Sequence, residues 1–299
     1  MNKQTLSTLL AGTFLSVYVA NGAVAGEALF AKVKTAEPLP DGAGELYLKT
    51  TRRDDKGQGD YTAYDYVVEY EYGVTDRFTA SAALKALSID TSGLIIDGYL
   101  PKEEEFTFKP SGMEVEASYN FLSPALDDIG LSVSFGLDYG WLDSHSGQDK
   151  DTISTDLGLQ IQKYLLDGQL IWAGNAKLET TWADRKEIDN LPEDFDWPTD
   201  PEMEIELGAS TGLSYRFAPN WFLGAEIQYE EEYETEVNRE RWSWFAGPNI
   251  HYGGKSFWAT LSWLDQLRGG GEKYEGQPSD LHLIEKTKTE LMLQIGFNF

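Results

Sequence analysis

Apolar and polar residues alternate along much of this chain with a period of two residues. The last stretch shows the pattern clearly, because its apolar positions are Leu291, Leu293, Ile295, Phe297 and Phe299. The positions between them are mostly polar or small. Successive side chains of a β-strand leave opposite faces. The pattern therefore predicts a strand with one apolar and one polar face.

The same alternation recurs and predicts twelve strands. They are Glu45–Arg52, Tyr64–Tyr72, Phe78–Ala86, Met113–Phe121, Leu131–Trp141, Ile153–Tyr164, Leu170–Trp182, Met203–Phe217, Trp221–Glu230, Trp242–Tyr252, Phe257–Trp263 and Lys286–Phe299. Short connections fall near residues 74, 125, 167, 219 and 254, and longer charged ones near 57, 100, 147, 192, 236 and 276. An even strand number with short turns on one side is typical of outer-membrane barrels. We therefore predict an all-β fold, a transmembrane antiparallel up-and-down barrel of about 12 strands.

Composition supports this class. Aromatic residues make up 13% of the chain, with 9 Trp and 16 Tyr, while the hydrophobic fraction is 41%. A barrel needs aromatic girdles at the membrane interfaces, yet alternates its apolar residues with polar ones. Aromatic residues also gather toward both ends of the predicted strands. The mean hydropathy is −0.40, and no mature segment gives the roughly 20 apolar residues of a membrane-spanning helix.

Charge and cysteine content exclude other classes. The formal net charge is −26, which excludes a nucleic-acid partner because such binders need a positive field. The chain has no cysteine, so disulfides, cysteine metal sites and thiol nucleophiles are excluded. We predict no cofactor and no metal centre.

The N-terminus reads as an export signal. Residues 1–25 combine a single positive charge at Lys3, an apolar core and small residues before the cleavage point, which is typical of a secretory signal peptide. Residues 26–44 contain Pro38 and Pro40 and show little periodicity, so we predict a non-strand segment. It lies either in the periplasm or inside the barrel, and residues 45–299 form the barrel. The predicted location is the outer membrane of a Gram-negative cell.

The polar strand faces should line the lumen, since the apolar faces must meet lipid. The candidate lumen residues are Asp65, Glu69, Glu71, Lys85, Glu114, Glu116, Asp138, Asp156, Lys177, Glu179, Glu204, Glu206, Arg216, Glu226, Lys288 and Glu290. Lys49, Glu230 and Lys286 share this parity, while Tyr47 and Trp258 leave the faces of their strands ambiguous. The acidic excess predicts a narrow passive channel for small cationic or neutral polar solutes. A lumen filled by ion pairs remains the alternative, since barrels of about this size lie between filled barrels and wide porins.

Two further functions stay open. A closed barrel could act at the cell surface through acidic outer loops. These loops comprise the runs 103–105, 184–202 and 230–240, where carboxylates could bind divalent cations and reach lipopolysaccharide. A lipid-modifying enzyme would need a nucleophile with a histidine, and His251 is the candidate on an interior face beside Asn249. No Gly-x-Ser-x-Gly or His-Glu-x-x-His motif is present, so we predict no enzyme.

The sequence shows two resemblances to known proteins. The strand pattern, the connections and the terminal phenylalanine resemble those of bacterial outer-membrane barrels. That resemblance implies an assembly signal at Phe297 and Phe299, read by the barrel-assembly machinery, with membrane lipid and lipopolysaccharide as partners. Three stretches, Leu29–Glu37, Arg52–Gly57 and Tyr72–Phe78, resemble an uncharacterised family of such barrels. That family implies no functional residues.

Overall fold

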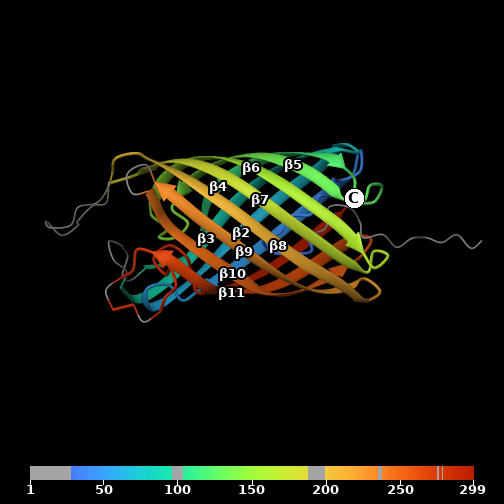
Figure 1. Ribbon diagram of the computed structural model, residues 1–299. Coiled ribbons are helices and arrows are strands. Elements are labelled where there is room, and N and C mark those ends of the chain that lie inside the picture. The colour runs from blue at the N-terminus through green and yellow to red at the C-terminus, as the bar shows by residue number, and fades with distance from the viewer. Residues whose placement is uncertain (1–27, 96–103, 188–198, 235–237, 275, 278) are drawn as a thin grey trace, which may run out of the picture.

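The computed structural model describes residues 28–95, 104–187, 199–234, 238–274, 276–277 and 279–299, and these form a closed barrel. The predicted signal peptide, residues 1–25, lies outside the described residues. The strands are β1 (Gly44–Asp54), β2 (Gln58–Thr75), β3 (Phe78–Ile95), β4 (Glu104–Leu122), β5 (Gly130–Leu142), β6 (Asp149–Leu165), β7 (Leu170–Arg185), β8 (Glu202–Ala218), β9 (Trp221–Glu234), β10 (Asn238–Gly253), β11 (Phe257–Gly271) and β12 (Thr289–Asn298). Figure 1 shows the barrel from the side, with the C-terminus at the end that carries the short turns.

Each strand pairs antiparallel with its sequence neighbours, and β12 pairs with β1 to close the ring. That closing ladder runs from Glu45 opposite Asn298 to Asp54 opposite Thr289. Closure leaves no unpaired sheet edge, which a structure in lipid requires because lipid cannot satisfy backbone polar groups. The predicted fold class and strand number are confirmed.

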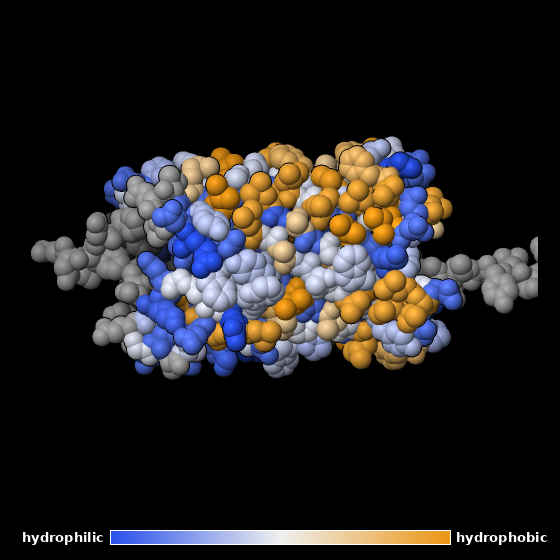
Figure 2. Space-filling model, viewed as in Figure 1, coloured by the Kyte–Doolittle hydropathy of each residue, from blue (hydrophilic) through white to orange (hydrophobic). Residues whose placement is uncertain are grey.

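The period-two pattern places apolar side chains on the outer wall. Val115 and Leu223 are 52% and 56% exposed, while their inward neighbours Glu116 and Gly224 are less so. Figure 2 shows apolar side chains spread over the wall and hydrophilic ones gathered at the loop end. A water-soluble protein rarely exposes so continuous an apolar surface. No described helix could span a bilayer.

Several strands extend beyond their predicted ends. β2 begins at Gln58 rather than Tyr64, β3 continues to Ile95, and β4 begins at Glu104 rather than Met113. The connections near residues 57 and 147 are consequently the short segments 55–57 and 143–148. The prediction of long loops at these positions is wrong. The alternation weakens beyond the membrane, where both faces meet water, although the backbone pairing continues there.

The acidic run 230–240 is corrected for the same reason. Residues 230–234 belong to β9 and Glu240 to β10, so the run is not an outer loop. Within β9 the acidic side chains alternate. Glu230 and Glu232 line the lumen, and Glu231 pairs with Arg239. Of the other acidic runs, Glu104 and Glu105 lie in β4, and residues 103 and 188–198 lie outside the described residues.

Candidate functional site

The interior of the barrel holds a cavity of about 800 Å³. Among the described residues that line it are seventeen aspartates and glutamates and only nine lysines and arginines. The lining is therefore acidic even after every basic side chain is paired. A confined space of one charge sign concentrates ions of the opposite sign and repels ions of its own.

Most of the sequence-predicted lumen residues lie along this cavity. They are Asp65, Glu69, Glu71, Lys85, Glu114, Glu116, Asp138, Asp156, Lys177, Glu179, Glu204, Glu206 and Glu290. Lys49, Glu230 and Lys286 also line it. The parity argument works here because the strands are regular through the membrane, where a one-residue slip would turn charged side chains toward lipid.

Three predicted lumen residues lie elsewhere. Arg216 is near the short-turn end of β8, outside the cavity lining. Glu226 points inward but is covered by residues 31 and 32. Lys288 precedes β12 and is exposed, with its Nζ 3.9 Å from Asp55. Strand parity cannot be extended to Lys288 because β12 begins only at Thr289.

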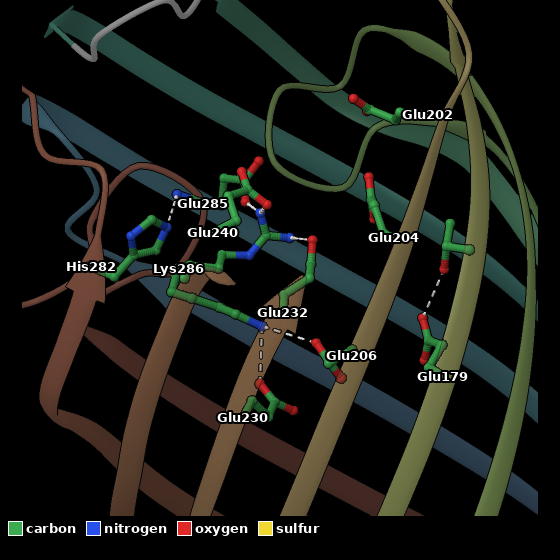
Figure 3. A network of polar contacts seen from close by, with 12 residues as sticks. Glu179, Glu202, Glu204, Glu206, Glu230, Glu232, Glu240, His282, Glu285 and Lys286 are labelled. Atoms are coloured by element: carbon green, nitrogen blue, oxygen red, sulfur yellow. Dashed lines mark hydrogen bonds and ion pairs between the residues drawn. The ribbon is translucent and has the colours of Figure 1, made fainter. Parts of the chain in front are cut away.

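Inward lysines bridge carboxylates on neighbouring strands. Lys85 contacts Glu114 at 2.7 Å and also Asp138, while Lys177 contacts Glu179 at 2.5 Å and Glu206 at 3.5 Å. Lys286 reaches Glu230 at 2.9 Å and Glu206 at 3.6 Å, as Figure 3 shows. Cross-strand ion pairs of this kind fix the side chains along the wall without filling the lumen.

Residues 28–43, which we call the N-terminal segment, cross the lumen at the short-turn end. Asn175 of β7 accepts from the N–H of Lys34 at 2.7 Å and donates to its carbonyl at 2.8 Å. Glu226 of β9 accepts from the N–H groups of Ala31 and Lys32 at 2.8 and 2.7 Å. Side chains of the wall thus replace the strand partner that this backbone lacks, as buried backbone groups require.

The same pattern continues around the ring. Gln162 of β6 accepts from the N–H of Ala36 at 2.9 Å, while Asn120 of β4 and Ser132 of β5 donate to its carbonyl. Gln294 of β12 donates to the carbonyl of Phe30 at 2.8 Å. Further contacts reach β3 through Thr79, β8 through Ser210 and β11 through Thr260. The segment is therefore tied to strands on every side of the lumen.

Apolar packing seals the segment against one wall. Leu29, Phe30 and Val33 form a buried cluster with Ile171, Ala173 and Phe222, which point inward from β7 and β9. A Cβ placed on Gly212 of β8 would lie 2.6 Å from the Phe30 ring, so glycine makes room for that ring. The prediction left the location of residues 26–44 open, and the described part lies inside the barrel.

Two lysines of the segment point toward the lumen carboxylates. Lys32 contacts Glu290 of β12 at 2.8 Å, and Lys34 contacts Glu116 of β4 at 2.5 Å. The Lys34 side chain remains 59% exposed, because its ammonium lies in the open part of the cavity. Carboxylate oxygens of Glu114, Glu116 and Asp156 converge around this position, all within 4.8 Å of one another.

Two connections fold inward at the opposite end. In the first, 143–148, the carbonyl of Ser144 accepts from Arg53 at 2.6 Å and that of His145 from Tyr61 at 3.1 Å. In the second, 272–288, Ile284 joins an apolar cluster on the inner faces of β2 and β3. Both connections narrow the lumen from the loop side.

Ion pairs fasten the second connection. Glu285 pairs with Arg241 of β10, which also holds Glu232 at 2.5 Å and Glu240 at 3.0 Å. Burial alone would lower the pKa of Lys286, but the attraction of Glu230 and Glu206 raises it above its ordinary range. Burial, with Arg241 and Lys286 nearby, lowers the pKa of His282 to about 3. The connection 272–288 therefore carries a charged lysine, Lys286, and a neutral histidine, His282, at neutral pH.

Sequence reasoning missed ten charged residues of the described lining: Lys32, Lys34, Glu37, Glu45, Arg53, Asp143, Lys150, Glu232, Arg241 and Glu285. Glu232 continues the inward alternation of β9, so a longer strand prediction would have found it. Arg241 shares the parity of Ser243 in β10. Glu285 lies outside any strand and carries no periodic signal. The two ambiguous aromatics, Tyr47 and Trp258, both point inward, where Trp258 donates to Glu45 at 3.0 Å.

The three histidines all lie away from the lipid-facing wall. His251 is fully buried inside the barrel and hydrogen-bonds Thr260 at 2.7 Å through Nδ1. His282 is 2% exposed, and His145 is half-buried in an inward-folded connection.

The barrel resembles solved outer-membrane proteins. An outer-membrane channel from Pseudomonas putida F1 aligns with a TM-score of 0.57 at 14% identity, over 90% of this chain and 100% of that chain. The beta domain of the Bordetella autotransporter BrkA aligns with a TM-score of 0.55 at 11% identity, over 87% and 100%. At these identities the likeness concerns the fold. In sequence, the model of a family of unknown function (DUF6662) matches residues 22–299. No protein of curated function matches the chain.

Proposed function

The chain belongs to this family of unknown function, and we propose that it is a gated outer-membrane channel for small cationic or neutral polar solutes. The acidic cavity of about 800 Å³ carries this proposal. It is continuous along the lumen between the N-terminal segment and the inward-folded connections. A packed barrel would fill this volume with side chains.

The wall fits lipid and the ends fit water, which supports the outer membrane as the location. The predicted signal peptide, residues 1–25, would direct export and then be cleaved. Insertion follows from recognition of the C-terminal strand by the assembly machinery. Lipid and lipopolysaccharide then surround the apolar wall.

Charge selectivity follows from the lining. Nine basic side chains cannot balance seventeen acidic ones, so the lumen keeps a negative potential toward a passing solute. Moreover, lysines such as Lys85 and Lys177 are engaged by carboxylates on both sides and offer no free track to an anion. The channel therefore favours cations, admits small neutral polar molecules and rejects anions.

The N-terminal segment must move for conduction, since it crosses the lumen. Its anchors are hydrogen bonds and ion pairs, each contributing about 1 kcal/mol net. Segments held in this way open locally at a lower free energy than the whole fold. The barrel wall, closed by twelve ladders, stays intact while the segment leaves.

A disulfide lock tests the channel and its gate together. The native chain has no cysteine, so Ala36→Cys with Ser132→Cys creates a single possible bridge where the Ser132 hydroxyl donates to the Ala36 carbonyl at 2.8 Å. In planar bilayers, we expect cation-selective conductance steps from the reduced protein and none after oxidation. The Ala36→Cys single variant is the matched control and should conduct under both conditions. Absence of steps from the reduced protein, or anion selectivity, would refute the channel.

A closed surface barrel is the second candidate function, and the ring of segment contacts favours it. Residues 28–43 are hydrogen-bonded to side chains of the inner wall along their length, which suits a permanently closed barrel. A silent bilayer from both the reduced and the wild-type protein would select this candidate. Binding of divalent cations to the acidic residues at the loop end of the barrel would then be its remaining property to measure.

A further inference from the structure

A β-bulge turns one arginine of β11 toward the outer wall. In the pairing of β10 with β11, Trp244 lies opposite Arg268. The next residue of β10 lies opposite Gln266, so Leu267 is an extra residue in β11. Gln266 is buried on the inner face, whereas Leu267 and Arg268 are both exposed. A bulge of this kind re-aims the side chains that follow it. Without the extra residue, the strand alternation would point Arg268 into the lumen.

The charge of Arg268 is not neutralised by the chain. Three other cations on the outer face at the loop end each pair with carboxylates, namely Arg52 with Asp54 at 2.9 Å, Lys186 with Asp151 and Asp184 at 2.8 Å, and Arg239 with Glu231 at 3.7 Å. Within the part of the chain that the structure describes, Arg268 forms no such pair. The acid of its own strand, Asp265, accepts hydrogen bonds from Trp263 and Thr289 instead. The guanidinium is therefore available to a partner outside the chain.

Aromatic rings place Arg268 at the edge of the membrane. Trp244 is 37% exposed, and its ring centroid lies 4.8 Å from that of Tyr229 on β9, the strand next to β10 (Figure 1). Trp242 lies two residues nearer the loops. A Cβ on Gly270 would be 2.4 Å from its Nε1, so the bare backbone of Gly270 lets the indole lie against β11. Tryptophan and tyrosine favour the headgroup level of a membrane. Arg268 thus lies where acyl chains give way to headgroups.

The surroundings of Arg268 suit a lipid with a phosphate on a sugar. Long connections of outer-membrane barrels lie outside the cell, so the loop end faces the outer leaflet. A guanidinium offers a rigid fork of N–H donors that matches phosphate oxygens. The neighbouring indoles present flat apolar surfaces with a polar edge, which fit a sugar ring. Nearer the membrane centre, Leu267 and Trp263 are 56% and 52% exposed and meet acyl chains. A phosphorylated glycolipid combines these three parts in one molecule.

We propose that Arg268, flanked by Trp242 and Trp244, binds a phosphate of lipid A, the phosphorylated glycolipid of the outer leaflet, on the outer wall of β10 and β11. This site goes beyond the proposed channel, because a lipid on the outer wall needs no open lumen. The competing explanation is that Arg268 only extends its guanidinium into water, as long basic side chains do at membrane edges. In that case the protein has no preference for the phosphates of the lipid.

Native mass spectrometry of the full chain in detergent, titrated with lipid A, measures this binding. Bisphosphorylated lipid A should bind the wild-type protein about tenfold more tightly than the same lipid with both phosphates removed. Arg268→Gln should abolish this difference. Arg268→Lys should keep part of it, because an ammonium retains the charge but not the planar fork. Arg52→Gln is the matched control. It removes an arginine at the same end that Asp54 already neutralises, and it should leave the preference unchanged.

Equal binding of the two forms of lipid A to the wild-type protein would refute the site, and this comparison does not depend on the folding of any variant. Equal losses in Arg268→Gln and Arg52→Gln would also refute it, because they would show attraction to charge anywhere on the rim. Phosphatidylglycerol that binds as tightly as lipid A would overturn the assignment to a glycolipid. A phosphate preference that disappears only in Arg268→Gln supports the site whether or not planar bilayers show conductance.

Discussion

Gly73 of β2 lies so close to Pro40 that a Cβ at position 73 would be 2.0 Å from the Pro40 carbonyl oxygen. Two backbone hydrogen bonds lock the approach, from Gly42 N–H to the Gly73 carbonyl at 2.8 Å and from Gly73 N–H to the Ala43 carbonyl at 2.9 Å. The absence of a side chain at Gly73 therefore fixes where the N-terminal segment enters the barrel.

The first prediction concerns this contact. Gly73→Val places two methyl groups against backbone atoms that cannot rotate away, at a cost of about 1–3 kcal/mol. The N-terminal segment should shift from its entry point. In planar bilayers, the fraction of time that the channel is open should rise about tenfold. Gly174→Ala is the matched control, since its Cβ would lie 3.4 Å from the Trp172 ring, an ordinary contact. A Gly73→Val channel as quiet as wild type would show that the entry point does not hold the gate.

The strands and their faces could be predicted from the sequence, whereas contacts such as that between Gly73 and Pro40 could not. Alternation at positions such as Leu291 and Leu293 predicts strands, their number and their faces, because lipid on one side and water on the other impose a period of two. It predicts the lumen acids for the same reason. Closure of β1 on β12 follows from the need to leave no edge in lipid.

The N-terminal segment has no such period, and its placement could not be predicted. Its partners, Asn175, Gln162 and Gln294, are uncharged amides on inward faces. An amide there suits water as well as a buried backbone, so the sequence does not distinguish the two. The inward fold of residues 272–288 is hidden similarly, because Glu285 and Arg241 find each other only in three dimensions.

The second prediction tests the anchor at Glu226. Its two oxygens accept from Ala31 and Lys32, and an amide at this position would turn one N–H toward another. Glu226→Gln should cost the segment about 1–3 kcal/mol. Amide hydrogens of residues 31 and 32 should then exchange about tenfold faster or more by mass spectrometry. Glu231→Gln is the control. It alters another acid of β9, the one that pairs with Arg239, and should leave the exchange of residues 31 and 32 unchanged. Equal protection in both variants would contradict the anchor.

The third prediction separates assembly from stability at the C-terminus. Phe299 exchanges two backbone hydrogen bonds with Gly44, at 3.0 and 2.8 Å, and its ring lies 6.0 Å from that of Tyr70. Deleting Phe299 leaves the ladder from Glu45 to Asn298 in place. We expect normal refolding into detergent but a several-fold lower folded fraction in cells, measured by heat-modifiable gel mobility. Phe217→Ala, an exposed aromatic at the end of β8, is the matched control. Equal losses in vitro and in cells would remove the assembly role of the terminal residue.

The fourth prediction concerns acid and the connection 272–288. His282 is buried, its backbone N–H donates to the side-chain oxygen of Gln266 at 2.7 Å, and its ring Nε2 accepts from the backbone N–H of Glu285. Burial first, then Arg241 and Lys286, lower the pKa of His282 from 6.5 to about 3. The folded state thus prefers the neutral ring, while the unfolded connection binds a proton near its ordinary pKa. The stability of the folded connection is therefore fully present above about pH 6.5, and it falls as the pH drops toward 3. Hydrogen exchange in residues 279–287 should accelerate across that window while the β1–β12 ladder stays protected. His282→Asn should remove the pH dependence, and an acid response that survives in this variant would assign the sensor to another group.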